Sequence, residues 1–179
     1  MPVPEASMRA TEAGLEPEGD GWFVVNAREA VWMHTDELGS ACFFEGEDAR
    51  FQQLGINVNV VRPGQPSSMY HRENRQEDFL VVSGECILVI EGEERPLEAW
   101  DFVHCPPEAE HVLIGAGNGP CVFIAVGARG PGGQVHYPVS EVARKHGAAA
   151  EEATDEPKQA YARFERPVDG PFRDGDLPD

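Results

Sequence analysis

The sequence has few basic residues and no long hydrophobic run. Lysine and arginine together number 14 against 32 aspartate and glutamate residues, which gives a formal net charge of -18 at pH 7. A surface this acidic repels nucleic-acid backbones and anionic membranes. The apolar runs are short, as at residues 122–126, and none approaches the ~18 residues of a membrane-spanning helix. We therefore expect neither nucleic acid nor a membrane as a partner.

Cysteine is also scarce, and none of the four cysteines belongs to a C-x-x-C pair. Isolated cysteines of this kind favour small buried hydrophobic residues over a disulfide framework. Residues 1–20 carry five acidic residues and one basic residue. They lack the basic start and the apolar stretch of a secretory signal, which favours a cytoplasmic location.

The residue types divide the 179-residue chain into three parts. Residues 1–20 have little apolar pattern and predict a flexible N-terminal arm. Residues 21–128 contain short apolar runs separated by glycine, proline, asparagine or aspartate, and they are expected to form one domain. Residues 129–179 predict a C-terminal extension that is partly helical, at about residues 139–146 and 158–164, with a disordered acidic end.

The central part has the pattern of a β protein. Residues 56–60 alternate apolar and polar side chains, which is typical of a half-buried strand. Similar short runs recur at close intervals and end at tight turns such as Ser83-Gly84. Many short strands of this kind predict an all-β sandwich or closed barrel with short C-terminal helices, rather than an α/β sheet.

Four side chains in this region are candidate metal ligands. His71, Glu73 and Glu77 are spaced by even numbers of residues. Residues two apart on a strand point to the same face, so that these side chains can point into a barrel and converge with His111 from another strand. Two imidazoles with one or two carboxylates suit Zn, Mn, Fe, Ni or Co. Cys105 lies close in sequence and is a minor alternative ligand.

Three further residues are candidates for contacts with a substrate. Tyr70 and Gln76 flank the candidate ligands and could hydrogen-bond a substrate or a metal-bound water, although Tyr70 could equally be a packing residue. His104 could act as an acid or base near neutral pH if it faces the cavity. The favoured alternative for His104 is a core histidine with one satisfied nitrogen.

The stretch from residue 64 to residue 115 resembles the two motifs of the cupin superfamily. The first motif is a glycine, then His-x-His, then a glutamate and a glycine seven residues later; the matching residues here are Gly64, Glu77 and Gly84. The second motif is Gly-Asp, then Pro-x-Gly, then a histidine; the matching residues here are Asp101, Pro106 and His111. The fifteen residues between the motifs, 85–99, fit the short hairpin linker of the family.

The sequence departs from these motifs in a few places. His-x-His is reduced to His71-x-Glu73, and the two glycines of the second motif are replaced by Trp100 and Glu108. Its terminal asparagine falls on Gly115. The family's usual count from the first glycine lands on Tyr70 and Arg72. The register that is one residue later is preferred, because the side chains of His71 and Glu73 can coordinate a divalent ion and share the parity of Glu77.

The resemblance implies a cupin double-stranded β-helix, or jelly-roll barrel, over residues 21–128 and a homodimer. It also implies one divalent transition metal, with Zn, Mn, Fe or Ni as candidates, and a small-molecule ligand. The implied function is a metal-dependent enzyme, either a dioxygenase or isomerase-like. The alternative is a non-catalytic module that binds a small ligand or metal, because the fold does not choose between them. The scattered arginines disfavour a phosphosugar substrate.

Overall fold

The computed structural model describes residues 1–178, and the all-β fold class predicted from the sequence is confirmed. No helix in this range is long and apolar enough to cross a membrane. The two helices are one turn each, α1 (Glu141–Arg144) and α2 (Pro157–Ala160). The strands are β1 (Ser7–Thr11), β2 (Gly14–Glu18), β3 (Trp32–Thr35), β4 (Gly39–Phe43), β5 (Leu54–Val61), β6 (Arg72–Glu73), β7 (Glu77–Ser83), β8 (Glu85–Ile90), β9 (Glu93–Glu98), β10 (Phe102–Cys105), β11 (His111–Ala116), β12 (Cys121–Ala128), β13 (Val135–His136) and β14 (Val168–Gly170).

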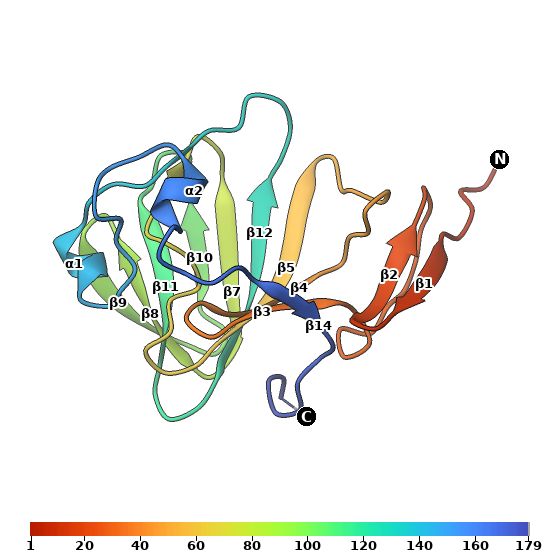
Figure 1. The fold of residues 1–179 in the computed structure, drawn as a ribbon, viewed down its shortest axis with the longest axis horizontal. Helices are drawn as coiled ribbons and strands as arrows, with labels where there is room; N and C mark the ends of the chain where they lie inside the picture. Colours follow the sequence, from red (N-terminus) through yellow and green to blue (C-terminus); the bar gives the residue numbers. More distant parts are fainter. Residues whose placement is uncertain (179) are drawn as a thin grey trace.

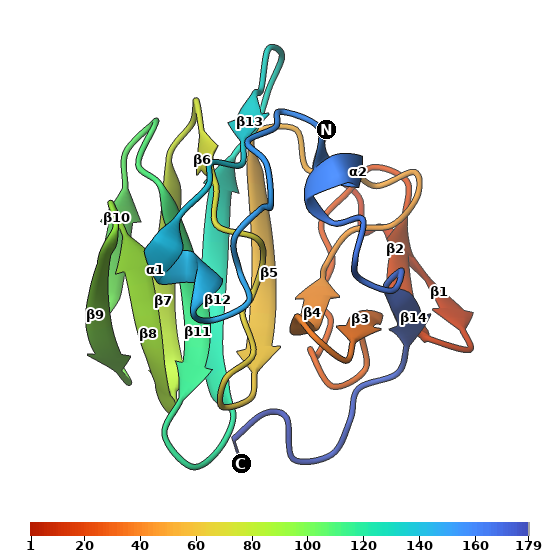
Figure 2. The same cartoon turned by 60° about the vertical axis from the view of Figure 1, so that its left-hand side comes forward.

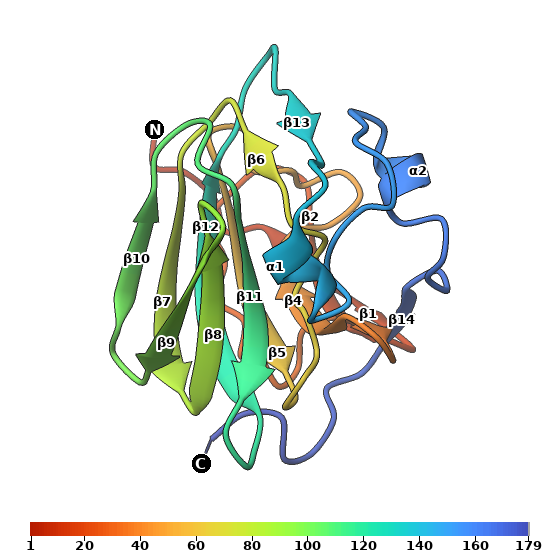
Figure 3. The same ribbon diagram turned by 90° about the vertical axis from the view of Figure 1, so that its left-hand side faces the viewer.

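Two antiparallel sheets form the body of the molecule. The large sheet has the strand order β10-β7-β12-β5-β4-β3-β14, and the small sheet has the order β11-β8-β9. Figure 3 shows β9, β8 and β11 as one layer in front of β10, β7 and β12. Each sheet has one face turned to the other and therefore needs apolar side chains at every second position.

The apolar core lies between these two layers. In β10, Val103 and Cys105 are buried in this core, whereas Phe102 and His104 are exposed on the other face. The alternation follows from the two-residue period of a strand. The other core residues are contributed by both sheets: Val61, Phe79, Val81, Cys86, Leu88, Leu113, Cys121 and Phe123.

The N-terminal segment, predicted as a flexible arm, contains a two-stranded antiparallel sheet of β1 and β2. It lies to one side of the main body (Figure 1). The amide of Leu15 donates a hydrogen bond to the carbonyl of Glu29 at 2.7 Å. The composition gave no indication of these strands, because their side chains are largely charged or polar, such as Arg9 between Glu16 and Glu18, and show no apolar alternation.

The C-terminal extension packs on both sheets (Figure 2). Ala143 of α1 is buried against the outer face of the small sheet, and β14 pairs with β3 at the edge of the large sheet. The acidic end, predicted as disordered, packs on the large sheet instead. Phe172 lies 5.7 Å from Trp32 between ring centroids, and Asp176 pairs with Arg62 at 2.6 Å. An aromatic contact and a partnered carboxylate anchor a segment whose other charges suggested solvation.

Two residues that replace glycines of the resembled motif have a left-handed backbone. The φ angle is 79° at Trp100 and 72° at Glu108. Glycine adopts this conformation without a steric penalty, whereas another residue pays about 1–2 kcal/mol. The chain therefore keeps the turn geometry of the motif with residues that are strained in it.

Replacement of Trp100 by glycine tests this strain. The side chain is 74% exposed, so that little packing is lost. We expect Trp100→Gly to raise the free energy of unfolding by about 1 kcal/mol, measured by urea denaturation. Trp22→Gly is the matched control, because Trp22 is also exposed but is not among the residues with positive φ. It should lower the stability slightly. A loss of stability in both variants would contradict the prediction.

Candidate metal centre

A pair of facing backbone segments brings His71 and His111 together. The amide of each residue donates a hydrogen bond to the carbonyl of the other, at 3.2 Å and 2.8 Å, and the two residues form an antiparallel bridge. Directly opposed residues of such a pair place their side chains on the same face. The two imidazole rings accordingly lie 4.9 Å apart between centroids.

Glu77 approaches this pair from the opposite layer. It is the first residue of β7 and has the parity of Phe79 and Val81, which point into the core. Its Oε2 lies 3.5 Å from Nε2 of His71 and 3.2 Å from Nε2 of His111. The three ligand atoms lie within 4.8 Å of one another, so that two imidazoles and one carboxylate meet inside the barrel.

Backbone carbonyls orient both imidazoles. Nδ1 of His71 lies 2.8 Å from the carbonyl oxygen of Met69, and Nδ1 of His111 lies 3.0 Å from that of Ala109. A carbonyl oxygen only accepts, so that each Nδ1 is the donor. A neutral ring then has its lone pair on Nε2, directed at Glu77. This arrangement is typical of metal-binding histidines.

The charges of the centre favour a cation between the three side chains. Burial by itself raises the pKa of Glu77, but the two imidazoles beside it lower this pKa to about 2. Burial lowers the pKa of His111, but the Cys105 thiol and Glu77 outweigh it and raise this pKa to about 9. The pKa of His71 is also raised, because Glu77 more than offsets burial. A divalent ion would supply the positive charge that these protons otherwise provide.

The geometry fits a divalent transition metal. Two ligand atoms bound to the same ion at about 2.1 Å lie roughly 3.0–3.5 Å apart, which matches the distances from Glu77 to both imidazoles. Glu77 Oε2 and His111 Nε2 are buried, and beyond the contacts among these three side chains neither has a hydrogen-bond partner in residues 1–178. Buried polar atoms without partners are rare in native proteins, and an ion at this position would satisfy both.

A cavity of about 150 Å³ adjoins the three side chains. Asn57 and Asn59 of β5 point into it, and their Oδ1 and Nδ2 atoms respectively are buried without a partner in the described part of the chain. The sequence reasoning missed both residues. The alternation of apolar and polar side chains at residues 56–60 predicted a strand with two different faces, but it did not show which face lines the inside of the barrel. Val58 and Val60 pack on the outer side against Trp32.

Glu73 lies near the centre but outside the group of three converging side chains. Its carboxyl is half-buried on the short strand β6, and its pKa is raised by burial and by the charge of Glu77. The charges of His71 and His111 act in the opposite direction, which indicates that the carboxyl is close enough to interact with both rings.

The three predicted substrate contacts point away from the cavity. Tyr70 is buried on the outer face of the small sheet, where its hydroxyl accepts a hydrogen bond from the Gly92 amide at 3.2 Å. Gln76 is exposed and donates to Asp78 at 2.6 Å. His104 is neither in the cavity nor in the core: it is on the exposed face of β10 and lies 2.7 Å from Asp78. Strand parity places Tyr70 and His104 on the outer face, whereas their neighbours His71 and Cys105 point inward.

Two tyrosines of the C-terminal extension lie beside the centre, although neither lines the small cavity. The ring of Tyr137 lies 5.9 Å from that of His71 between centroids, and Tyr161 packs edge-on against Tyr137. The hydroxyl of Tyr161 accepts a hydrogen bond from the amide of Met69 at 3.1 Å. Met69 is the residue whose carbonyl orients His71, so that the extension supports the centre. No motif in the sequence pointed to either tyrosine.

Comparison with known proteins agrees with this architecture. A family model described as the cupin domain matches residues 57–127. No curated protein matches the sequence. Among solved structures, a sugar phosphate isomerase of the cupin superfamily from Silicibacter pomeroyi is 26% identical with a TM-score of 0.51, and the match covers 63% of this chain and 71% of that one.

Two further solved structures are similar. The polyketide cyclase RemF from Streptomyces resistomycificus is 14% identical with a TM-score of 0.52, over 60% of this chain and 79% of that one. A protein from Acidithiobacillus ferrooxidans that is assigned to the sugar phosphate isomerases is 26% identical with a TM-score of 0.49, and the match spans 64% of its length and 54% of this chain. The sequence match and the two-sheet barrel agree with each other: residues 57–127 match the cupin domain and lie in a barrel like those of cupin-superfamily structures.

Proposed function

We propose that the protein is a metal-dependent enzyme that acts on a small organic substrate inside the barrel. The observation that carries the proposal is the convergence of Glu77 Oε2 on Nε2 of His71 at 3.5 Å and on Nε2 of His111 at 3.2 Å, beside a cavity. Burial of these ionisable side chains costs desolvation energy that an apolar side chain would not. A residue that only stabilised the barrel would be apolar here, like its neighbour Phe79.

His71, Glu77 and His111 would hold the ion. Two imidazoles and one carboxylate suit Fe, Zn, Mn or Ni and leave further coordination positions for ligands. A bound ion would supply Lewis acidity at a carbonyl or hydroxyl group or, if it is iron, reactivity toward dioxygen.

The protein's own side chains would orient the substrate and exclude water. Asn57 and Asn59 offer an amide oxygen and an amide nitrogen without other partners, which suits them to hydrogen-bond a small polar group. Phe79 and Phe123, 6.1 Å apart between ring centroids, form the apolar wall behind the centre. A closed wall of this kind strengthens polar interactions within the cavity because it excludes water.

The reaction class is proposed as an oxidation by dioxygen or an isomerisation. The likeness to a sugar phosphate isomerase of the same superfamily supports the second of these. The alternative is a non-catalytic module that binds a small ligand. The outward position of His104 favours this alternative, because the cavity then lacks the histidine that the sequence suggested as an acid or base.

The first prediction of the proposed function concerns the bound metal. Protein purified without added metal should contain about one divalent ion per chain by elemental analysis, and His111→Ala should lose nearly all of it. His104→Ala is the matched control, because this imidazole lies on the outer face, and it should retain the ion. Full retention of metal by His111→Ala in a folded protein would contradict the proposal.

The second prediction separates Glu73 from the three converging side chains. We propose that Glu73 interacts with the centre through its charge or through water rather than as a direct ligand. Glu73→Gln should then weaken metal affinity by about tenfold, while Glu77→Gln should weaken it by considerably more. Competition with a chromogenic chelator measures both affinities. An equal loss of metal affinity in the two variants would show that Glu73 is a direct ligand, as Glu77 is.

The third prediction concerns turnover. Metal-loaded protein is assayed with phenols and keto acids by oxygen consumption and with sugar phosphates by NMR. We expect turnover in one of the two assays, reduced at least a hundredfold in His111→Ala and unchanged in His104→Ala. Metal binding with no turnover in either assay would support the non-catalytic module.

The homodimer and the cytoplasmic location expected from the sequence stay predictions. Size-exclusion chromatography with light scattering tests the first.

A further inference from the structure

A second, larger cavity lies next to the metal centre. Its volume is about 880 Å³, and it is lined by β3, β4 and β5 on one side and by residues 158–167 of the C-terminal extension on the other. Asn59 and Ser67 line both this cavity and the small one beside His71 and His111. A molecule bound in the larger cavity would therefore adjoin the candidate metal centre.

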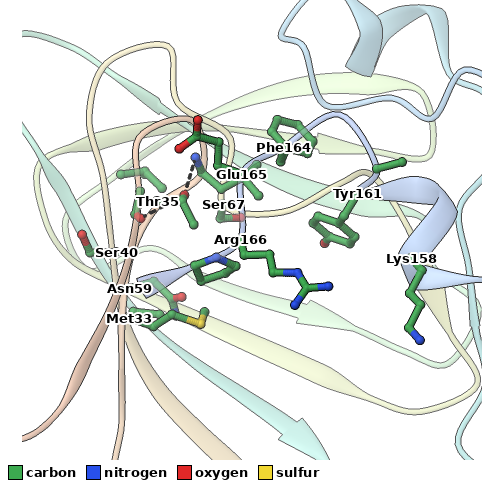
Figure 4. Close-up of a pocket in the computed structure, with 16 residues that line it drawn as sticks. Met33, Thr35, Ser40, Asn59, Ser67, Lys158, Tyr161, Phe164, Glu165 and Arg166 are labelled. Carbon is green, nitrogen blue, oxygen red and sulfur yellow. Dashed lines mark hydrogen bonds between the residues drawn. The ribbon is translucent and has the colours of Figure 1, made fainter. Parts of the chain in front are cut away.

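Two cationic side chains line this cavity. Lys158 and Arg166 belong to the C-terminal extension. Figure 4 shows that both side chains point away from the carboxylate of Glu165. Neither forms an ion pair with a carboxylate in residues 1–178, whereas Arg62 and Arg129 do. Both residues are exposed, so that their charges are available to an anion that enters this cavity.

The remaining wall suits the carbon skeleton of an organic molecule. Met33 and Leu38 contribute apolar surface from the β3–β4 hairpin, and Phe164 contributes it from the extension. Tyr161 lies between the two cavities, because it lines the larger one and its hydroxyl accepts from Met69 beside His71. Cavities with apolar walls and a few convergent polar groups are typical of small-molecule sites.

We propose that the larger cavity binds the anionic end of an organic substrate, a carboxylate or a phosphate ester, through Arg166 and Lys158. This inference rests on the proposed function, because it assigns the substrate class of the same site. The other end of the substrate reaches the metal centre past Asn59 and Ser67. Arginine pairs with carboxylate and phosphate oxygens through two parallel hydrogen bonds, and lysine adds a point charge.

Calorimetric titration of the full-length, metal-loaded protein tests the inference. The probes are phenyl phosphate and benzoate, with benzyl alcohol as the neutral compound of similar size. We expect saturable binding of at least one anion and binding of the alcohol that is at least about tenfold weaker. Tighter binding of phenyl phosphate would identify a phosphate ester as the substrate class, and tighter binding of benzoate would identify a carboxylate.

The double variant Lys158→Gln/Arg166→Gln should weaken binding of the anion by about tenfold or more. The matched control is Lys145→Gln/Arg173→Gln, which removes the same charge from two cations that do not line this cavity. It should bind the anion as the unmodified protein does. Absence of anion binding, unchanged affinity in the first variant, or an equal loss in both variants would overturn the inference.

Elemental analysis of each sample keeps this test separate from that of the metal centre. Both double variants should retain the ion, since none of the four residues belongs to the three converging side chains. Metal content without anion binding would refute only the larger cavity as a substrate site. Anion binding by a protein that holds no metal would refute only the proposed metal centre.

Discussion

The hydrogen-bonded backbone pair of His71 and His111 is the constraint on which the centre depends. It fixes two residues from segments forty positions apart in a register that gives both side chains the same face. The carbonyls of Met69 and Ala109 then set the rotation of each ring. A shift of either segment by one residue would turn one imidazole to the outer face and leave Glu77 without its neighbours.

The surrounding protein maintains this polar centre inside an apolar barrel. Phe79 packs at 5.3 Å from the ring of His111 between centroids and closes one side. The C-terminal extension closes another side, where Tyr137 lies against His71 and Tyr161 binds the backbone at Met69. The extension thus connects two features: it supports an imidazole of the candidate metal centre, and it provides the cationic wall of the larger cavity.

Two turns keep the backbone conformation of the cupin motif although their glycines are replaced by other residues. Trp100 and Glu108 occupy positions where the cupin motif has glycine, and both keep the left-handed backbone that explains the glycine. The conformation is retained because the flanking contacts hold it, including the hydrogen bond from the amide of Trp100 to the carbonyl of Val81 at 2.8 Å.

The sequence by itself determined the all-β class, the turns and the shared parity of His71 and Glu77, because these depend on local spacing and the two-residue period of a strand. It did not determine which face of residues 56–60 is internal, and Asn57 and Asn59 were missed for that reason. The tertiary structure alone decided that Tyr161 reaches Met69, 92 positions away, and that Arg166 and Lys158 line a cavity beside the centre. Such contacts depend on how the C-terminal extension folds back over the barrel, and no periodicity within a single segment encodes that path.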